Sequence, residues 1–254
     1  SLLAGSIFAS AIGVQAQDNN TPEIPVDVHD TMHNDIGVYA RGKYLAYVKT
    51  PNPTANQIAR YGLTALAIEA KRSTSIEIDG IVGIDLEIDD LTPFRFLYWP
   101  STEQQESLSQ EARAKLRKFK NNFGVIAADV IDGRSIRTSQ GLRTILQNAE
   151  VRPVEVLSEG HTLTETFCIM DNLRGTTNRE VLIERIPEDA PESDRSAFII
   201  GAQNWATAWA GASVGPDAHE QALCSGLNMI YYAYAGETVD AEWMQAIIPE
   251  KRHF

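Results

Sequence analysis

Short apolar runs alternate with amphipathic stretches along most of the chain. Residues 125–130 (VIAADV) form an apolar run too short for a helix, which is typical of a strand buried on both faces of a parallel sheet. Residues 108–123 carry apolar side chains three or four positions apart, which predicts a helix with one buried face. Other strands are predicted at 44–49, 75–78, 84–89, 94–100, 154–157, 179–186 and 197–200. This alternation predicts an α/β fold with a doubly wound, mostly parallel sheet flanked by helices.

Pairs of polar residues three positions apart mark the expected starts of helices. The pairs are Thr54 with Gln57, Ser107 with Gln110, and Asp217 with Glu220. Helices are therefore predicted at 54–71, 108–123, 138–149 and 217–235, and Gly236 would end the last of them.

The first 17 residues carry no charge and include a small-x-small pattern at Val14-Gln15-Ala16. We expect this stretch to be a signal-peptide or membrane-anchor remnant, with a buried helix as the alternative. Residues 18–42 are polar and predict an arm or linker, and 43–254 predict a single domain. A signal peptide or an anchor would place the domain in the periplasm or on a membrane-anchored envelope protein. Cys168 and Cys224 could pair in that compartment.

Composition narrows the class of protein further. The 254 residues include 34 acidic and 22 basic side chains, a formal charge of -12, which disfavours nucleic acid as a partner. Neither a glycine-rich phosphate loop nor a zinc motif is present, so no cofactor or metal is predicted. The acidic run at 85–90 departs from the EF-hand template, whose twelfth place is occupied by Phe96, and we interpret it as a solvated edge.

Reactive side chains are expected where strands end, because ligands of open α/β sheets bind beyond the carboxyl ends of the strands. Asp129 lies near the end of the predicted strand 125–130, and Asp132 lies in the following turn. Burial would raise the pKa of Asp129. The carboxylate could then act as a general base or ligand contact, or it could bind loop amides.

Four other positions complete the candidate sites. His161 could shuttle protons or bind a loop carbonyl. Asn204 and Trp205 could form a pocket wall or a hydrophobic lid, and Trp99 ends an aromatic strand. The predicted ligand-binding set is Asp129, Asp132, His161, Asn204, Trp205 and Trp99. Ser213 matches the G-x-S-x-G nucleophile pattern, with Asp240 and His253 downstream, although the nearest predicted strand ends well before it.

Several of these motifs occur together in one known family. They are Asp89-Asp90 before Tyr98-Trp99-Pro100, Asp129, His161 with Leu163 and Phe167, Asn204-Trp205 with Trp209, and Gly226, Asn228, Tyr232 and Gly236. Over residues 44–236 the chain resembles a bacterial family, domain of unknown function 4159. The resemblance implies a class I glutamine amidotransferase-like fold in a membrane-anchored envelope protein. It also implies that the glutaminase triad is missing, because Asp129 stands where that class has a cysteine and His219 directly precedes Glu220.

The resulting expectation is a non-catalytic domain of the bacterial cell envelope that binds a small ligand or a partner protein. One alternative is a hydrolase with Asp129 as base and His161 as acid. A weaker alternative is a serine hydrolase that uses Ser213. An acid–base enzyme requires Asp129 and His161 to meet in one cavity, whereas a binding domain allows them to be separate or bonded to the backbone.

Overall fold

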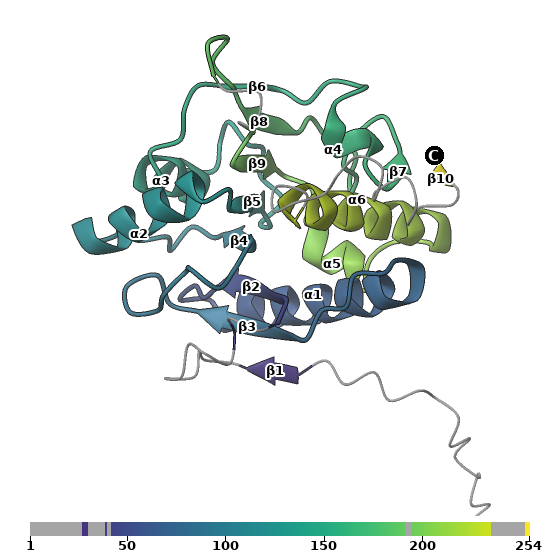
Figure 1. Ribbon diagram of the computed structural model, residues 1–254, viewed down its shortest axis with the longest axis horizontal. Helices are drawn as coiled ribbons and strands as arrows, with labels where there is room; N and C mark the ends of the chain where they lie inside the picture. Colours follow the sequence, from purple (N-terminus) through teal and green to yellow (C-terminus); the bar gives the residue numbers. More distant parts are fainter. Residues whose placement is uncertain (1–26, 30–38, 40–41, 191–194, 235–251) are drawn as a thin grey trace, which may run out of the picture.

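The computed structural model describes residues 27–29, 39, 42–190, 195–234 and 252–254. Its main sheet has eight strands in the order β1-β3-β2-β4-β5-β9-β8-β6 (Figure 1). The strands are β1 (Asp27–His29), β2 (Tyr44–Val48), β3 (Gly80–Ile84), β4 (Phe96–Ser101), β5 (Val125–Val130), β6 (Val154–Val156), β8 (Leu182–Glu184) and β9 (Phe198–Gly201). From β1 to β9 neighbouring strands are parallel, and β8 is antiparallel to both β9 and β6. The predicted α/β fold with a mostly parallel sheet is confirmed.

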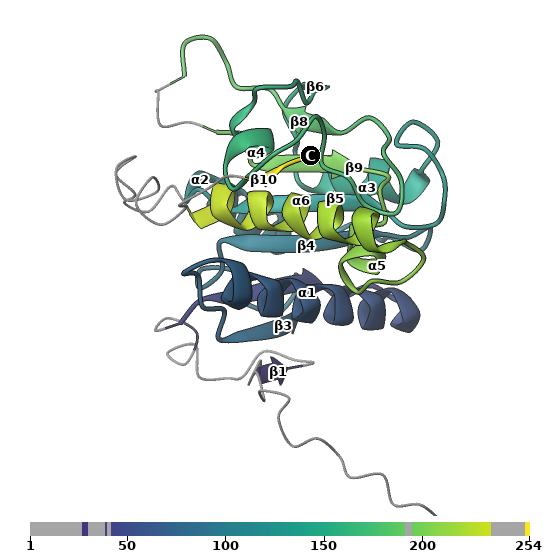
Figure 2. The ribbon, with the colours of Figure 1, turned by 90° about the vertical axis from the view of Figure 1, so that its right-hand side faces the viewer.

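Helices cover both faces of this sheet (Figure 2). One face carries α1 (Pro53–Ser73), α5 (Trp205–Trp209) and α6 (Pro216–Tyr234), and the other carries α2 (Gln110–Asn121) and α3 (Gln140–Asn148). Val125 and Ala127 of β5 pack into the first core, whereas Ile126 and Ala128 pack into the second. The apolar run at 125–130 therefore reflects a strand whose two faces are both covered.

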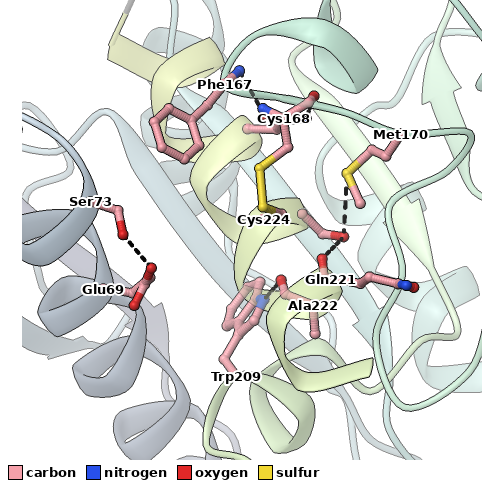
Figure 3. The surroundings of a disulfide bond; sticks show 11 residues. Glu69, Ser73, Phe167, Cys168, Met170, Trp209, Gln221, Ala222 and Cys224 are labelled. Carbon is pink, nitrogen blue, oxygen red and sulfur yellow. Dashed lines mark hydrogen bonds between the residues drawn. A yellow bond between two sulfur atoms is a disulfide. The ribbon is translucent and has the colours of Figure 1, made fainter. Parts of the chain in front are cut away.

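A disulfide joins α6 to a smaller element. Cys168 and Cys224 are bonded, which links β7 (Cys168–Ile169) to α6 (Figure 3). β7 pairs in parallel with β10 (Arg252–His253). Asn228 of α6 supports the same junction: its Oδ1 accepts the N–H groups of Phe167 and Cys168, each at 2.8 Å. The pairing that the sequence left open is thus formed. The short helix α4 (Thr162–Glu165) precedes β7.

Two predicted strands differ from the structure. No strand covers 75–78, and β3 begins at Gly80. Residues 85–90 form a turn rather than a strand, because Asp85 Oδ1 accepts the Glu87 N–H at 2.9 Å and Asp89 Oδ2 accepts the Asp85 N–H at 2.6 Å. The alternation of apolar and acidic residues misled the prediction, since Ile88 is 77% exposed at the tip of this turn.

Other predicted boundaries shift or fall outside the described residues. The Ser107 pair was misplaced, because the N-cap of α2 is Ser109. Residues 1–17 and Gly236 lie outside the described residues, whereas 27–29, within the predicted arm, form β1. Among the helices that the structure describes, none combines the length and apolar character needed to cross a membrane.

Candidate functional site

Asp129 lies at the end of β5, fully buried, with both carboxylate oxygens occupied. Oδ1 accepts the N–H groups of Gln203 at 3.0 Å and Asn204 at 3.1 Å. Oδ2 accepts the Trp205 N–H at 2.6 Å and the Tyr98 hydroxyl at 2.9 Å. The structure therefore supports the loop-amide role, because a ligand could reach this carboxylate only by displacing bonds that connect β5 to the turn before α5.

Burial raises the pKa of Asp129 to about 6, and the hydrogen bonds from Trp205, Tyr98 and the two other amides partly oppose this rise. Burial and the neighbouring carboxylate also raise the pKa of Tyr98 well above its ordinary value. Asn204 adopts a left-handed conformation with φ of 53°, in the turn whose successive N–H groups bind Asp129.

His161 lies far from Asp129 in the fold. Its Nδ1 accepts the Leu163 N–H at 3.1 Å and caps α4, and burial lowers its pKa. Its ring lies 6.1 Å from that of Tyr232, whose hydroxyl accepts the N–H of Ser196 just before β9. Asp129 instead pairs with Gly201 at the carboxyl end of β9. The structure thus places the proposed base and acid at opposite ends of one strand, not in one cavity.

The G-x-S-x-G segment also lacks the geometry of a nucleophile elbow. That motif requires the serine on a turn directly between a strand and a helix. Here α5 intervenes between β9 and the exposed Ser213. Asp240 lies outside the described residues, and of His253 the structure describes only the backbone pairing with β7. The structure around Ser213 therefore lacks the strand–turn–helix arrangement that the serine-hydrolase alternative requires.

The remaining predicted site residues are dispersed. Trp205 is fully buried and its Nε1 donates to Leu173 O at 2.9 Å, so it belongs to the core rather than to a pocket wall. Trp99 is fully buried on the other face of the sheet. Asp132 is exposed in a turn, and Asn204 Oδ1 accepts the Thr207 hydroxyl at 2.7 Å. The predicted set does not converge on one pocket.

A cavity of about 330 Å³ opens where the carboxyl ends of β2, β3 and β4 meet, and we name it the β2–β3–β4 cavity. Its lining consists of Val48, Lys49, Thr50, Pro51, Asp85, Leu86, Glu87, Gln105, Glu106, Ser107 and Leu108. The sheet order places β3 on one side of β2 and β4 on the other. Ligands of open α/β sheets bind at this kind of topological switch point.

Two asparagines hold the cavity walls in place. Asn56 of α1 accepts the Thr50 N–H at 2.8 Å and donates to Thr50 O at 2.9 Å. Asn148 of α3 is buried, accepts the Leu108 N–H at 3.1 Å and donates to Glu106 O at 2.9 Å. The loops at 48–51 and 105–108 are therefore anchored to helices on opposite faces of the sheet.

Two further bonds orient side chains of the lining. Glu87 Oε1 accepts the Ser109 N–H at 2.9 Å, which ties the 85–87 turn to the start of α2. Hydrogen bonds from the Ser109 side chain and from its N–H lower the pKa of Glu87. Trp99 Nε1 donates to Gln105 Oε1 at 3.1 Å. Trp99 thus contributes to the cavity by positioning a neighbour, not by contacting a ligand.

The lining carries one ammonium and three carboxylates, and its formal charge is therefore −2. Lys49 is half-buried, and its ammonium has no hydrogen bond or ion pair with the described residues. The exposed carboxylate of Glu106 likewise has no partner in the described part of the chain. Among those residues no group of three or more His, Cys, Asp or Glu side chains is arranged to hold a metal ion. The cavity therefore presents charged groups of both signs, with an excess of negative charge.

Sequence reasoning missed this cavity although a signal was present. Lys49 and Asp85 each come directly after an apolar strand, whereas Asp129 lies within the end of one. Placing 84–89 in a strand concealed the end of β3 and hence the position of Asp85.

The architecture defines an α/β protein with a polar cavity at the carboxyl ends of its parallel strands. The chain belongs to the family described as Domain of unknown function (DUF4159), whose model matches residues 44–234. No curated protein matched the chain. A similar solved structure is the alpha-L-fucosidase isoenzyme 2 from Paenibacillus thiaminolyticus, with 10% sequence identity and a TM-score of 0.36. The match covers 74% of this chain and 32% of that one, so this chain spans well under two thirds of that protein.

Proposed function

We propose that this chain is a non-catalytic ligand-binding domain of a bacterial cell-envelope protein, and that it holds a small polar ligand in the β2–β3–β4 cavity. The observation that carries the proposal is the cavity itself, which lies at the switch point and exposes unpartnered charged groups. Its volume of about 330 Å³ falls within the range of small-molecule sites.

The chemistry of the fold supports binding rather than glutaminase activity. We propose a flavodoxin-like, class I glutamine amidotransferase-like topology, which the order β3-β2-β4-β5-β9 of the parallel strands supports. Enzymes of that class use a free thiol, whereas both cysteines of this chain are in the disulfide. Asp129 cannot replace the thiol, because four hydrogen bonds occupy its oxygens.

The proposed location in the periplasm or on a membrane-anchored protein is supported by the same disulfide. Disulfides persist mainly in oxidising compartments. The formal charge of -12 argues against a nucleic-acid partner, which leaves a small molecule or an envelope protein.

The proposal is tested by two-dimensional amide NMR with D-glucose, D-glucosamine and L-lysine as probes at millimolar concentration. We expect at least one probe to shift the amides of Lys49, Asp85 and Ser107, which line the cavity. The double variant Lys49→Met/Glu106→Gln should lose these shifts, and Lys71→Met, which changes an exposed lysine of α1, should keep them. If all three probes leave these amides unshifted, or if the double variant responds like the wild type, the cavity is not the binding site.

A further inference from the structure

We propose that the ligand of the β2–β3–β4 cavity is a zwitterion of the amino-acid class. Its carboxylate would be bound by Lys49 and Gln105, and its ammonium by the surrounding carboxylates. This inference rests on the proposed function, because it names the ligand class of the same cavity.

The anion subsite begins with Lys49. Its backbone N–H donates to Ile84 O at 2.8 Å, so the residue leaves the end of β2 beside the end of β3. Asp85 follows Ile84, yet the two side chains form no ion pair, and the Asp85 carboxylate turns back to the Glu87 N–H. The Lys49 ammonium has no hydrogen bond or ion pair with the described residues, so its donors are available to a ligand. Lys49 is therefore positioned to bind an anionic group that enters the cavity.

Gln105 supplies a second donor for that group. Its Oε1 accepts the indole N–H of the buried Trp99. Because the oxygen end of the amide is used there, the NH2 end remains available as a donor. A carboxylate can accept from both an ammonium and an amide, so Lys49 and Gln105 match one ligand carboxylate.

The cation subsite consists of carboxylates from two loops. Asp85 and Glu87 come from the turn after β3, and Glu106 comes from the loop after β4. One oxygen of Asp85 and both oxygens of Glu106 have no hydrogen bond from the described residues, whereas Glu87 accepts from both the N–H and the side chain of Ser109. A simple anion would be repelled by these three groups, and a simple cation would leave Lys49 unpaired. A ligand with both charges satisfies the two subsites together.

L-lysine provides a direct probe, with 1,5-diaminopentane as its analogue without the carboxylate and 6-aminohexanoate as its analogue without the α-ammonium. We expect L-lysine to shift the amides of Lys49, Asp85 and Ser107. Each analogue should bind at least about tenfold more weakly, the effect of one lost charge-assisted hydrogen bond.

Variants then assign each charge to its subsite. Lys49→Met should weaken the binding of L-lysine by about tenfold and leave the binding of 1,5-diaminopentane unchanged. In this variant the two ligands differ only by a carboxylate that has lost its partner, so its removal should have no further effect on affinity. Glu106→Gln should weaken the binding of both L-lysine and 1,5-diaminopentane. Lys49→Arg should retain the preference for L-lysine over 1,5-diaminopentane. Melting temperatures equal to that of the wild type show that these variants are folded.

The inference is overturned if the wild type binds L-lysine and 1,5-diaminopentane with equal affinity. It is also overturned if Lys49→Met weakens the binding of both ligands to the same extent. Should D-glucose shift the cavity amides while L-lysine does not, the ligand is uncharged and the proposed function alone survives. Failure of all probes in the cavity would overturn both proposals.

Discussion

At the scale of single residues, Asp129 joins parts of the chain that are distant in sequence. Tyr98 lies 31 positions before it, and the amides of Gln203 to Trp205 lie 74 to 76 positions after it. The sequence placed this carboxylate correctly at a buried strand end. It could not show the four donors, because they depend on which strand pairs with β5 and on the left-handed turn at Asn204.

The pKa of Asp129 predicts a pH dependence of stability. Its folded-state value of about 6 lies above the ordinary 3.8, so the folded protein holds the proton more tightly than the unfolded chain. This stabilisation is complete below about pH 4 and is lost as pH rises to about 6. The free energy of unfolding from urea titrations should therefore fall more steeply over this range in the wild type than in Asp129→Asn.

Asp132→Asn is the matched control, because Asp132 is exposed in the turn that follows the same strand. It should retain the wild-type pH dependence. If the free energy of unfolding varies with pH in the same way in the wild type and in Asp129→Asn, the Asp129 carboxyl does not change its protonation on folding.

At the scale of secondary-structure elements, α1 begins at a different residue from the one that the sequence signal indicated. Thr54 and Gln57 have capping-box spacing, yet Asn52 is the N-cap. Asn52 Oδ1 accepts the N–H groups of Thr54 at 3.0 Å and Ala55 at 3.2 Å. Pro53 suits the first helical position, because proline has no N–H to leave unsatisfied there. The signal therefore predicted the helix correctly but placed its first turn too late.

This difference can be measured with two substitutions. Asn52→Ala should reduce the free energy of unfolding by about 1 kcal/mol, the usual cost of losing an N-cap. Thr54→Ala should change it by less than about 0.5 kcal/mol, because Thr54 is exposed and its side chain makes no bond with the described residues. Urea denaturation of both variants decides between the two caps, and a larger loss for Thr54→Ala would assign the cap to Thr54.

At the scale of the whole molecule, the alternation of strands and helices predicted the α/β class but not the strand order. After β2 the chain adds β3 on one side of β2 and then β4 on the other side. This change of direction creates the switch point and its cavity. Nothing in the hydrophobic pattern distinguishes this order from others with equally buried strands. The candidate site was therefore expected beside Asp129 on β5, whereas the polar cavity lies at the ends of β2, β3 and β4, with β2 at its centre and separated from β5 by β4.

The disulfide also acts on the whole molecule, because it closes a loop with a sequence separation of 56 between Cys168 and Cys224. Closing such a loop restricts the unfolded chain, so the double variant Cys168→Ala/Cys224→Ala should lose about 2–5 kcal/mol of unfolding free energy. A reducing agent should lower the stability of the wild type by a similar amount and leave the double variant unaffected. Both sulfurs are buried, so reduction should proceed mainly when the protein unfolds, and the comparison requires equilibrium in urea. If the reducing agent leaves the wild-type midpoint unchanged, the cysteines are not paired in the folded protein, and the support for an oxidising compartment is lost with the bond.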